Sequence, residues 1–314
     1  MNISQNQNIN QLSFLDKLSR SIKERKSNLC VGIDPDIKFL PKPLLASKKT
    51  VPEKFEIFCK EIIKATAENC CSFKFQAAMF ASEACEDLLG EIIIWLRSNF
   101  PSHTVIFDGK RGDIGNTSYH YAKEAFERYK ADVATVSPFM GEESIRPFLE
   151  WRHKGVFLLC STSNPGADYM QGSNNSKEEL EQKLFFKAAL LAEKLNKEFA
   201  KKNKKLDSFN QYSEAVGLVV GAKREFQLSA LQKRFKNIPL LIPGIGAQGG
   251  SIKQLLNSTQ IFHRRDISNM APPHIINVSR SVIYADSTED WIKGARLESE
   301  KLKNELFNYS DVHK

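Results

Sequence analysis

The sequence contains no long hydrophobic run. No apolar stretch in its 314 residues reaches the roughly 18 residues needed to cross a bilayer. Residues 1–11 are polar and rich in Asn and Gln, and they lack the basic and apolar regions of a secretory signal. We therefore expect a cytoplasmic protein that does not contact membranes, with a disordered tail over residues 1–11.

Motifs typical of disulfide and metal sites are missing as well. The six cysteines include no C-x-x-C pair, and most lie within apolar stretches, which favours buried, reduced thiols. The six histidines show no H-E-x-x-H or similar ligand spacing. No Ser, His and Asp arrangement of the hydrolase type is visible. We expect no metal site, and cysteine or serine hydrolase chemistry is not indicated.

Positive charge is in excess, but it does not indicate nucleic-acid binding. The net charge is +8, and much of it comes from residues 194–205, which read as the solvated end of a long helix. A modest excess of this kind also suits a small anionic substrate. We expect no nucleic-acid partner.

Short apolar runs alternate with longer amphipathic stretches along the whole chain. The runs that read as buried parallel strands are Leu29–Ile33, Cys71–Phe75, Thr104–Phe107, Val133–Val136, Gly155–Leu159, Ala215–Val220, Pro239–Ile242 and Ile275–Val278. Helices are expected near residues 12–26, 54–68, 80–98, 116–129, 142–151, 176–202, 223–235, 249–257 and 289–307. Eight such units predict a (β/α)8 TIM-type barrel over residues 12–314 as one domain, with an open doubly wound sheet as the alternative. Residues 171–178 are expected to form a mobile loop after the fifth strand.

Charged and amide side chains gather where the predicted strands end, which is where barrel enzymes place their active sites. These residues are Asp34, Lys74, Gln76, Asp108, Lys110 and Asp113. Alternate residues of an extended segment point the same way, so Asp108 and Lys110 should share a face, with Lys74 beside them. Alternating carboxylates and ammoniums keep one another ionised. The pattern favours a catalytic site, and a structural salt-bridge network at the barrel rim is the alternative.

A glycine-rich segment follows the seventh predicted strand. Gly244–Gly249 matches G-x-G-x-x-G, the fingerprint of dinucleotide-binding folds. That fingerprint belongs after a first strand, however, and the next strand here ends in Arg280 rather than an acidic residue. A glycine turn followed by an arginine after the last strand instead indicates a phosphate site, which barrels commonly place there. A merely tight turn is the alternative.

These segments together resemble the motifs of the orotidine-5′-phosphate decarboxylase family, and more narrowly of its longer bacterial subgroup. Asp108–Thr117 resembles the signature D-x-K-x-x-D-I-x-x-T. The other matching segments, in family order, are Val31–Asp36 (VGLDPD in the family), Phe73–Gln76, Thr162–Gly166 (TSNP) and Pro243–Gly250 (PGIGAQGG), followed by Arg280. The motifs span most of the chain, and as a set they are far more specific than D-x-K-x-x-D alone.

The resemblance implies a reaction and roles at its centre. Orotidine 5′-monophosphate would lose CO2 from C6 of its pyrimidine and give uridine 5′-monophosphate, the last step of de novo UMP synthesis, without a metal or an organic cofactor. Lys110 would stabilise negative charge at C6 and then protonate that carbon. Asp108 and Asp113 would position Lys110 and crowd the departing carboxylate.

The resemblance also implies how substrate is held and that two subunits share each site. Asp113 would reach into the site of a partner subunit in a homodimer, and Thr117 would contact ribose across the interface. Lys74 and Asp34 would bind ribose hydroxyls, with Gln76 in support. Ser163 would bind the pyrimidine amide edge. The phosphate would be held by Pro243, Gln248 and Arg280.

Three other functions remain open at this point. Hexulose-phosphate synthase-like enzymes share D-x-K-x-x-D but use Mg²⁺ in aldol-type chemistry. A non-catalytic nucleotide-phosphate binding protein could keep the same pocket. An NADP-dependent oxidoreductase could be inferred from the glycine motif and Arg280.

Overall fold

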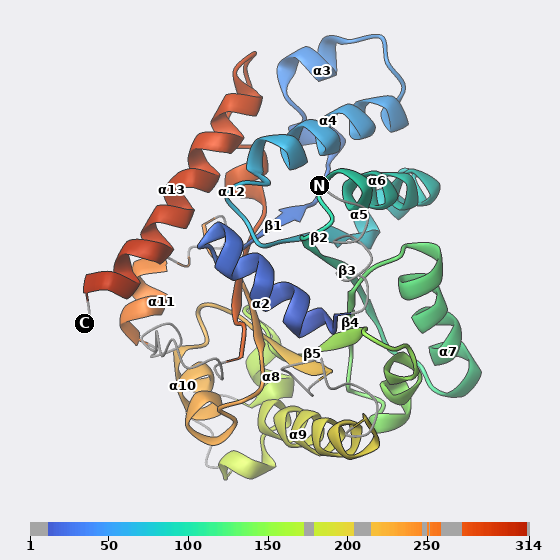
Figure 1. The fold of residues 1–314 in the computed structure, drawn as a ribbon, viewed down its shortest axis with the longest axis vertical. Helices are drawn as coiled ribbons and strands as arrows, with labels where there is room; N and C mark the ends of the chain where they lie inside the picture. The colour runs from blue at the N-terminus through green and yellow to red at the C-terminus, as the bar shows by residue number, and fades with distance from the viewer. Residues whose placement is uncertain are drawn as a thin grey trace.

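Eight parallel strands close into a barrel in the computed structural model, in the order β1 to β8 with β8 pairing back to β1. The structure describes residues 12–172, 179–203, 215–246, 250, 252–258 and 272–312. Helices surround the barrel, and the long last helix lies at one edge of the molecule (Figure 1). The barrel prediction is confirmed, and the open sheet is wrong. The expected tail over residues 1–11 lies outside the described residues, as do residues 173–178 of the expected loop.

The strands begin and end within a few residues of the predicted runs. They are β1 Leu29–Ile33, β2 Ser72–Gln76, β3 Thr104–Arg111, β4 Val133–Val136, β5 Gly155–Ser161, β6 Val216–Val220, β7 Leu240–Pro243 and β8 Ile275–Val278. Both faces of these strands are buried, one inside the barrel and one under the helices, so most of their residues are apolar, and the charged ones lie toward the carboxyl ends of β2 and β3. The largest difference is β3, which continues through Asp108 and Lys110 instead of ending at Phe107.

The helices follow the expected alternation. Those of the outer layer and the connections are α3 Lys42–Ala46, α4 Val51–Thr66, α5 Ala77–Ala81, α6 Glu86–Asn99, α7 Gly115–Lys123, α8 Ala167–Gln171, α9 Leu184–Asn203, α10 Glu225–Arg234, α11 Ile252–Ser258, α12 Arg280–Ile283 and α13 Trp291–Val312. Short 3₁₀ turns lie at η1 Ile37–Phe39, η3 Glu142–Ser144, η4 Arg146–Glu150 and η5 Leu180–Gln182, and a π-turn, η2 Glu124–Arg128, extends α7. In the part of the chain that the structure describes, no helix is both long and apolar enough to cross a membrane.

Three predicted helices differ for local reasons. α4 begins at Val51 instead of Lys54, because Thr50 and Glu53 form a capping box and Pro52 lies in the first turn. The helix expected over 80–98 is two helices, α5 and α6, separated at Ala84, whose φ of 52° is left-handed. The expected helix at 142–151 was wrong. That segment forms two 3₁₀ turns, and Pro147 near the start of η4 has no N–H to give to a regular helix.

An N-terminal helix, α2 (Phe14–Arg25), closes one end of the barrel. Phe14, Leu15 and Leu18 pack against inward-facing residues near the starts of the strands, and Figure 1 shows α2 lying across this end. Lys17 Nζ of this helix bonds Asp132 Oδ2, just before β4, at 2.8 Å in the buried interior. A site inside the barrel must therefore open at the other end, where the strands have their carboxyl termini. All six cysteines are free and buried, as expected.

Candidate active site

A cavity of about 720 Å³ lies at the carboxyl ends of the strands, and all eight strands or the loops after them contribute to its wall. Its polar lining comprises Asp34, Lys74, Gln76, Asp108, Lys110, Thr135, Thr162, Ser163, Asn164, Gln171, Asn277, Ser279 and Arg280. The structure therefore brings together, around one cavity, side chains that are as many as 246 positions apart in the sequence, from Asp34 to Arg280.

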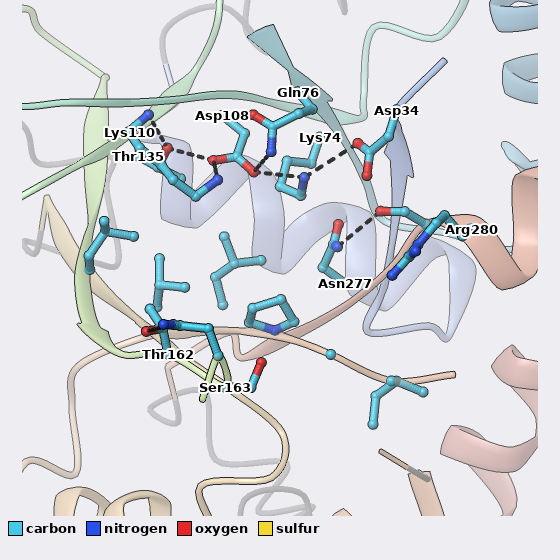
Figure 2. A pocket seen from close by; sticks show the side chains of 18 of the residues that line it. Asp34, Lys74, Gln76, Asp108, Lys110, Thr135, Thr162, Ser163, Asn277 and Arg280 are labelled. Carbon is cyan, nitrogen blue, oxygen red and sulfur yellow. Dashed lines mark hydrogen bonds and ion pairs between the residues drawn. The ribbon is translucent and has the colours of Figure 1, made fainter. Parts of the chain in front are cut away.

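Four charged side chains of alternating sign line one wall of the cavity (Figure 2). Lys74 Nζ donates to Asp108 Oδ2 at 2.8 Å and lies 3.7 Å from Asp34 Oδ1. Lys110 Nζ donates to the other oxygen, Asp108 Oδ1, also at 2.8 Å. The order Asp34, Lys74, Asp108, Lys110 leaves no net charge, so each ion is stabilised by a neighbour of opposite sign.

The network fixes the protonation state of its buried members. Burial alone would raise the pKa of Asp108, but the ammoniums of Lys74 and Lys110 outweigh it and hold that pKa well below its usual value. Burial alone would lower the pKa of Lys74, but Asp108 and Asp34 outweigh it and raise that pKa above its usual value. Asp108 and Lys74 are therefore charged across the physiological range.

The two lysines differ in their freedom. The side chain of Lys74 is 4% exposed, whereas that of Lys110 is 45% exposed. Lys74 is locked beneath the carboxylates, while the Lys110 ammonium faces the cavity with protons not used by Asp108. Lys110 is thus the cation of the network best placed to approach a bound molecule and give it a proton.

Lys110 reaches this position through an irregular backbone. Between the pairs Phe107–Ala134 and Arg111–Val136, β3 advances four residues while β4 advances two. The extra residues form a bulge, a feature often found beside active sites. Within it Lys110 has a φ of 45°, a left-handed conformation that costs about 1–3 kcal/mol for a residue with a side chain. Asp108 and Lys110 were expected to share a face because they are alternate residues of a regular strand. Their side chains do meet, but they do so because of the bulge.

Two neighbours support the Asp108 carboxylate. Thr135 Oγ1 donates to Asp108 Oδ1 at 2.8 Å and accepts the Lys110 backbone N–H at 3.0 Å. Gln76 Nε2 lies 3.4 Å from Asp108 Oδ2. With its amide turned over, Gln76 instead donates to the Asp108 carbonyl at 2.7 Å and accepts from Lys110 Nζ at 3.2 Å, which satisfies both groups. The expected supporting role of Gln76 is consistent with either orientation.

Two acceptors at the cavity accept no hydrogen bond from the described residues. They are Asp34 Oδ1, whose nearest cation is Lys74 Nζ at 3.7 Å, and Asn277 Oδ1, and both are buried. Asn277 lies on β8 and is 6% exposed, with its Nδ2 donating to Ser279 Oγ at 3.3 Å. Buried acceptors of this kind are costly unless a ligand or water supplies the donor. They suit a ligand that carries hydroxyl groups.

The loop after β5 forms another wall and carries Ser163. Thr162 N donates to Gln171 Oε1 at 2.8 Å, and Gln171 Nε2 donates back to Thr162 Oγ1 at 2.9 Å. Arg224 Nε donates to the Thr162 carbonyl at 2.6 Å, and its guanidinium also pairs with Asp168. The backbone just before Ser163 is therefore held from α8, through Gln171, and from Arg224 at the start of α10. Gln171 ends α8 rather than opening a loop.

The opposite end of the cavity carries the predicted phosphate site. Pro243 ends β7, and Gly244 and Gly246 have φ values of 103° and 76°, which residues with side chains rarely adopt. A Cβ at Gly246 would also lie 2.5 Å from Ser281 Oγ, so glycine lets this turn approach α12. Arg280 lines the cavity beside it (Figure 2). Gln248 lies outside the described residues.

Asp113 and Thr117 do not line the cavity of their own chain. Asp113 Oδ1 accepts the N–H of Ile114, and Thr117 lies exposed on the first turn of α7. Ile114, which follows Asp113 in the chain, is 50% exposed, and Phe139, in the segment after β4, is 70% exposed. Of the predicted site residues that the structure describes, only Asp113 and Thr117 lie outside this cavity.

Sequence reasoning missed several residues of the cavity wall. They are Thr135, Gln171, Asn277 and Ser279, whereas Thr162 and Asn164 belong to the matching segment Thr162–Gly166 but were given no role. Thr135 and Asn277 lie inside predicted strands, and a polar residue within an otherwise apolar strand is the signal that could have identified them.

Comparison with known proteins agrees with the geometry of this cavity. Residues 27–293 match the family model described as "Orotidine 5'-phosphate decarboxylase / HUMPS family". Proteins named orotidine 5′-phosphate decarboxylase from Janthinobacterium sp. (strain Marseille) and Delftia acidovorans are each 38% identical, covering 95% and 94% of this chain and 99% and 98% of the relatives. A solved structure titled a putative orotidine-monophosphate-decarboxylase from Toxoplasma gondii is 28% identical with a TM-score of 0.76, covering 94% of this chain and 98% of that one. The chain belongs to the orotidine 5′-phosphate decarboxylase / HUMPS family.

Proposed function

We propose that this chain decarboxylates orotidine 5′-monophosphate to uridine 5′-monophosphate and CO2, the step that completes UMP biosynthesis. The observation that carries the proposal is the Lys110 ammonium, held on Asp108 and facing the cavity. Near-full-length relatives at 38% identity that bear this enzyme's name support the same activity.

Loss of CO2 leaves an electron pair on C6, in the plane of the pyrimidine ring. The Lys110 ammonium stabilises that charge and then transfers a proton from Nζ to C6. The C6–carboxylate bond breaks, the C6–H bond forms, and no oxidant or reductant is required. Asp108 stays ionised because of its two lysines, so it holds the Lys110 ammonium in place and puts a negative charge near the departing carboxylate.

The remaining cavity residues hold the nucleotide. Ribose hydroxyls donate to Asp34 and Asn277, whose buried oxygens accept no hydrogen bond from the described residues, while the ion pair with Lys74 orients Asp34. Ser163, held in the loop after β5, binds the amide edge of the pyrimidine. This contact and the ribose contacts fix C6 opposite Lys110, which is the positioning that a unimolecular bond cleavage requires.

The phosphate binds at the other end of the cavity. Arg280 supplies the positive charge, and the turn from Pro243 through Gly246 supplies a surface without side chains. Gln248 contributes from the same loop. Binding energy at this remote group lowers the barrier at C6 because it holds the ring in the reactive position.

The active enzyme is a homodimer in which each site is completed by the other subunit. Asp113 and Thr117 lie outside the cavity of their own chain, and Ile114, which follows Asp113, is an apolar residue that is half exposed. An apolar surface of this kind marks a protein interface. Across a two-fold axis, Asp113 approaches the Lys110 of the other site, and Thr117 approaches its ribose.

Turnover is the direct test of the proposed activity. Purified protein dialysed against EDTA should convert orotidine 5′-monophosphate to uridine 5′-monophosphate at a rate that added Mg²⁺ does not change. The measurement is the fall in pyrimidine absorbance with the product identified by chromatography. Absence of turnover, or turnover only after Mg²⁺ is restored, would favour the aldol-type branch of the family instead.

A further inference from the structure

Thr135 occupies the one place where β4 meets the bulge of β3. It lies between Ala134 and Val136, the two β4 residues that pair with Phe107 and Arg111 on either side of the irregularity. The β3 residues between those pairs are out of register with β4, so their backbone groups must find other partners. Thr135 supplies one of them through its side chain.

The Thr135 hydroxyl makes two hydrogen bonds, one as an acceptor and one as a donor. It accepts the backbone N–H of Lys110 at 3.0 Å and donates its own proton to Asp108 Oδ1 at 2.8 Å. Asp108 Oδ1 is also the atom that accepts from Lys110 Nζ. One hydroxyl therefore joins the main chain of Lys110 to the carboxylate that holds its ammonium.

The Thr135 hydroxyl restrains Lys110 at its backbone N–H and, through Asp108, at its ammonium. The left-handed backbone of Lys110 persists only where its surroundings favour it. Its side chain is almost half exposed, so little packing holds it. Thr135 is 2% exposed and rigid at χ1 because it is β-branched, which makes its hydroxyl a fixed reference point inside the barrel.

We propose that Thr135 is a positioning residue for Lys110, which sets the direction of the Lys110 ammonium through the Lys110 N–H and Asp108 Oδ1. The inference rests on the proposed function, in which that ammonium faces C6. Thr135 does not transfer a proton itself. Its hydroxyl is already used in both directions, and its effect on the reaction passes through the geometry of Lys110.

Thr135→Val tests the inference because valine keeps the shape and removes the hydroxyl, and Thr135→Ser is its matched control. In the full-length protein, Thr135→Val should lower kcat for orotidine 5′-monophosphate by about 10- to 100-fold, the loss expected when a reacting group is misplaced by about 1 Å. KM and the affinity for UMP should stay within about threefold of the unmodified protein, because the ribose and phosphate contacts are untouched. Thr135→Ser should recover most of kcat.

Three results would overturn the inference. They are an unchanged kcat in Thr135→Val, an equal loss of kcat in Thr135→Ser, and a loss of UMP affinity as large as the loss of kcat. An unchanged kcat would mean that the Thr135 hydroxyl does not position Lys110. An equal loss in Thr135→Ser would assign the effect to the methyl group. A matching loss of UMP affinity would show that the whole cavity is disturbed.

A crystal structure of Thr135→Val separates this inference from the proposed function, because it requires no turnover. Lys110 should leave the left-handed region, or its ammonium should leave Asp108 Oδ1. If Lys110 keeps both, Thr135 does not position it, whatever reaction the protein catalyses. Inactivity of the unmodified protein, in contrast, would count against the proposed function alone.

Discussion

Replacing Lys110 with alanine should lower kcat for orotidine 5′-monophosphate by at least about 10⁴-fold, since proton transfer and charge stabilisation at C6 are lost together. Substrate affinity should fall far less, because the proposed contacts of Arg280, Ser163 and Asp34 are to groups remote from C6. The measurement is kcat by product formation, combined with UMP binding by calorimetry. An inactive variant that still binds UMP would assign the loss to chemistry.

Lys123→Ala is the control for this prediction. Lys123 is an exposed lysine on α7, its ammonium is 3.9 Å from Glu127, and it does not line the cavity. Its removal should leave kcat within about twofold, as is usual for an exposed surface ion pair. Comparable turnover in Lys110→Ala and Lys123→Ala would mean that the proton donor to C6 is another group.

Mixing two inactive variants should restore activity if each site is shared by two subunits. In a Lys110→Ala subunit paired with an Asp113→Ala subunit, one of the two sites keeps both native residues and the other keeps neither. Random exchange of equal amounts gives this pairing in half of the dimers, so about a quarter of all sites become active. The expected result is an increase from a negligible rate to about one quarter of the native rate per site.

Subunit exchange must be demonstrated in the same samples, for example by native mass spectrometry of differently tagged chains. Each variant incubated alone provides the baseline. If hybrid dimers form and the rate does not rise, Asp113 acts within its own chain or does not act at all, and the shared site is contradicted.

The sequence predicted the barrel because its strands carry a strong and simple signal. Parallel strands covered on both faces are apolar throughout, and eight such runs with helices between them leave few architectures. Knowing that sites lie at the carboxyl ends of barrel strands then selected Asp34, Lys74, Asp108 and Lys110, which do lie together.

The details of the site depended on features without such a signal. The bulge in β3 and the left-handed Lys110 result from the register between β3 and β4, which no local pattern encodes. Thr135 and Asn277 lie in predicted strands, where a single polar residue marks a candidate but does not show whether its side chain faces the cavity or the helices. A helix was predicted over 142–151, but Pro147 lies within this segment and lacks the N–H that a regular helix needs, so the segment forms two 3₁₀ turns.

A crystal structure of the protein with bound UMP tests the central claim most directly, which is that Lys110 faces C6 in a site completed by a second subunit. Lys110 Nζ should lie about 3–3.5 Å from C6, the distance of a reactive contact. The phosphate should lie on Arg280, and Asp113 of the partner subunit should approach the same Lys110. UMP bound with C6 away from Lys110, or a site formed entirely within one chain, would contradict the account.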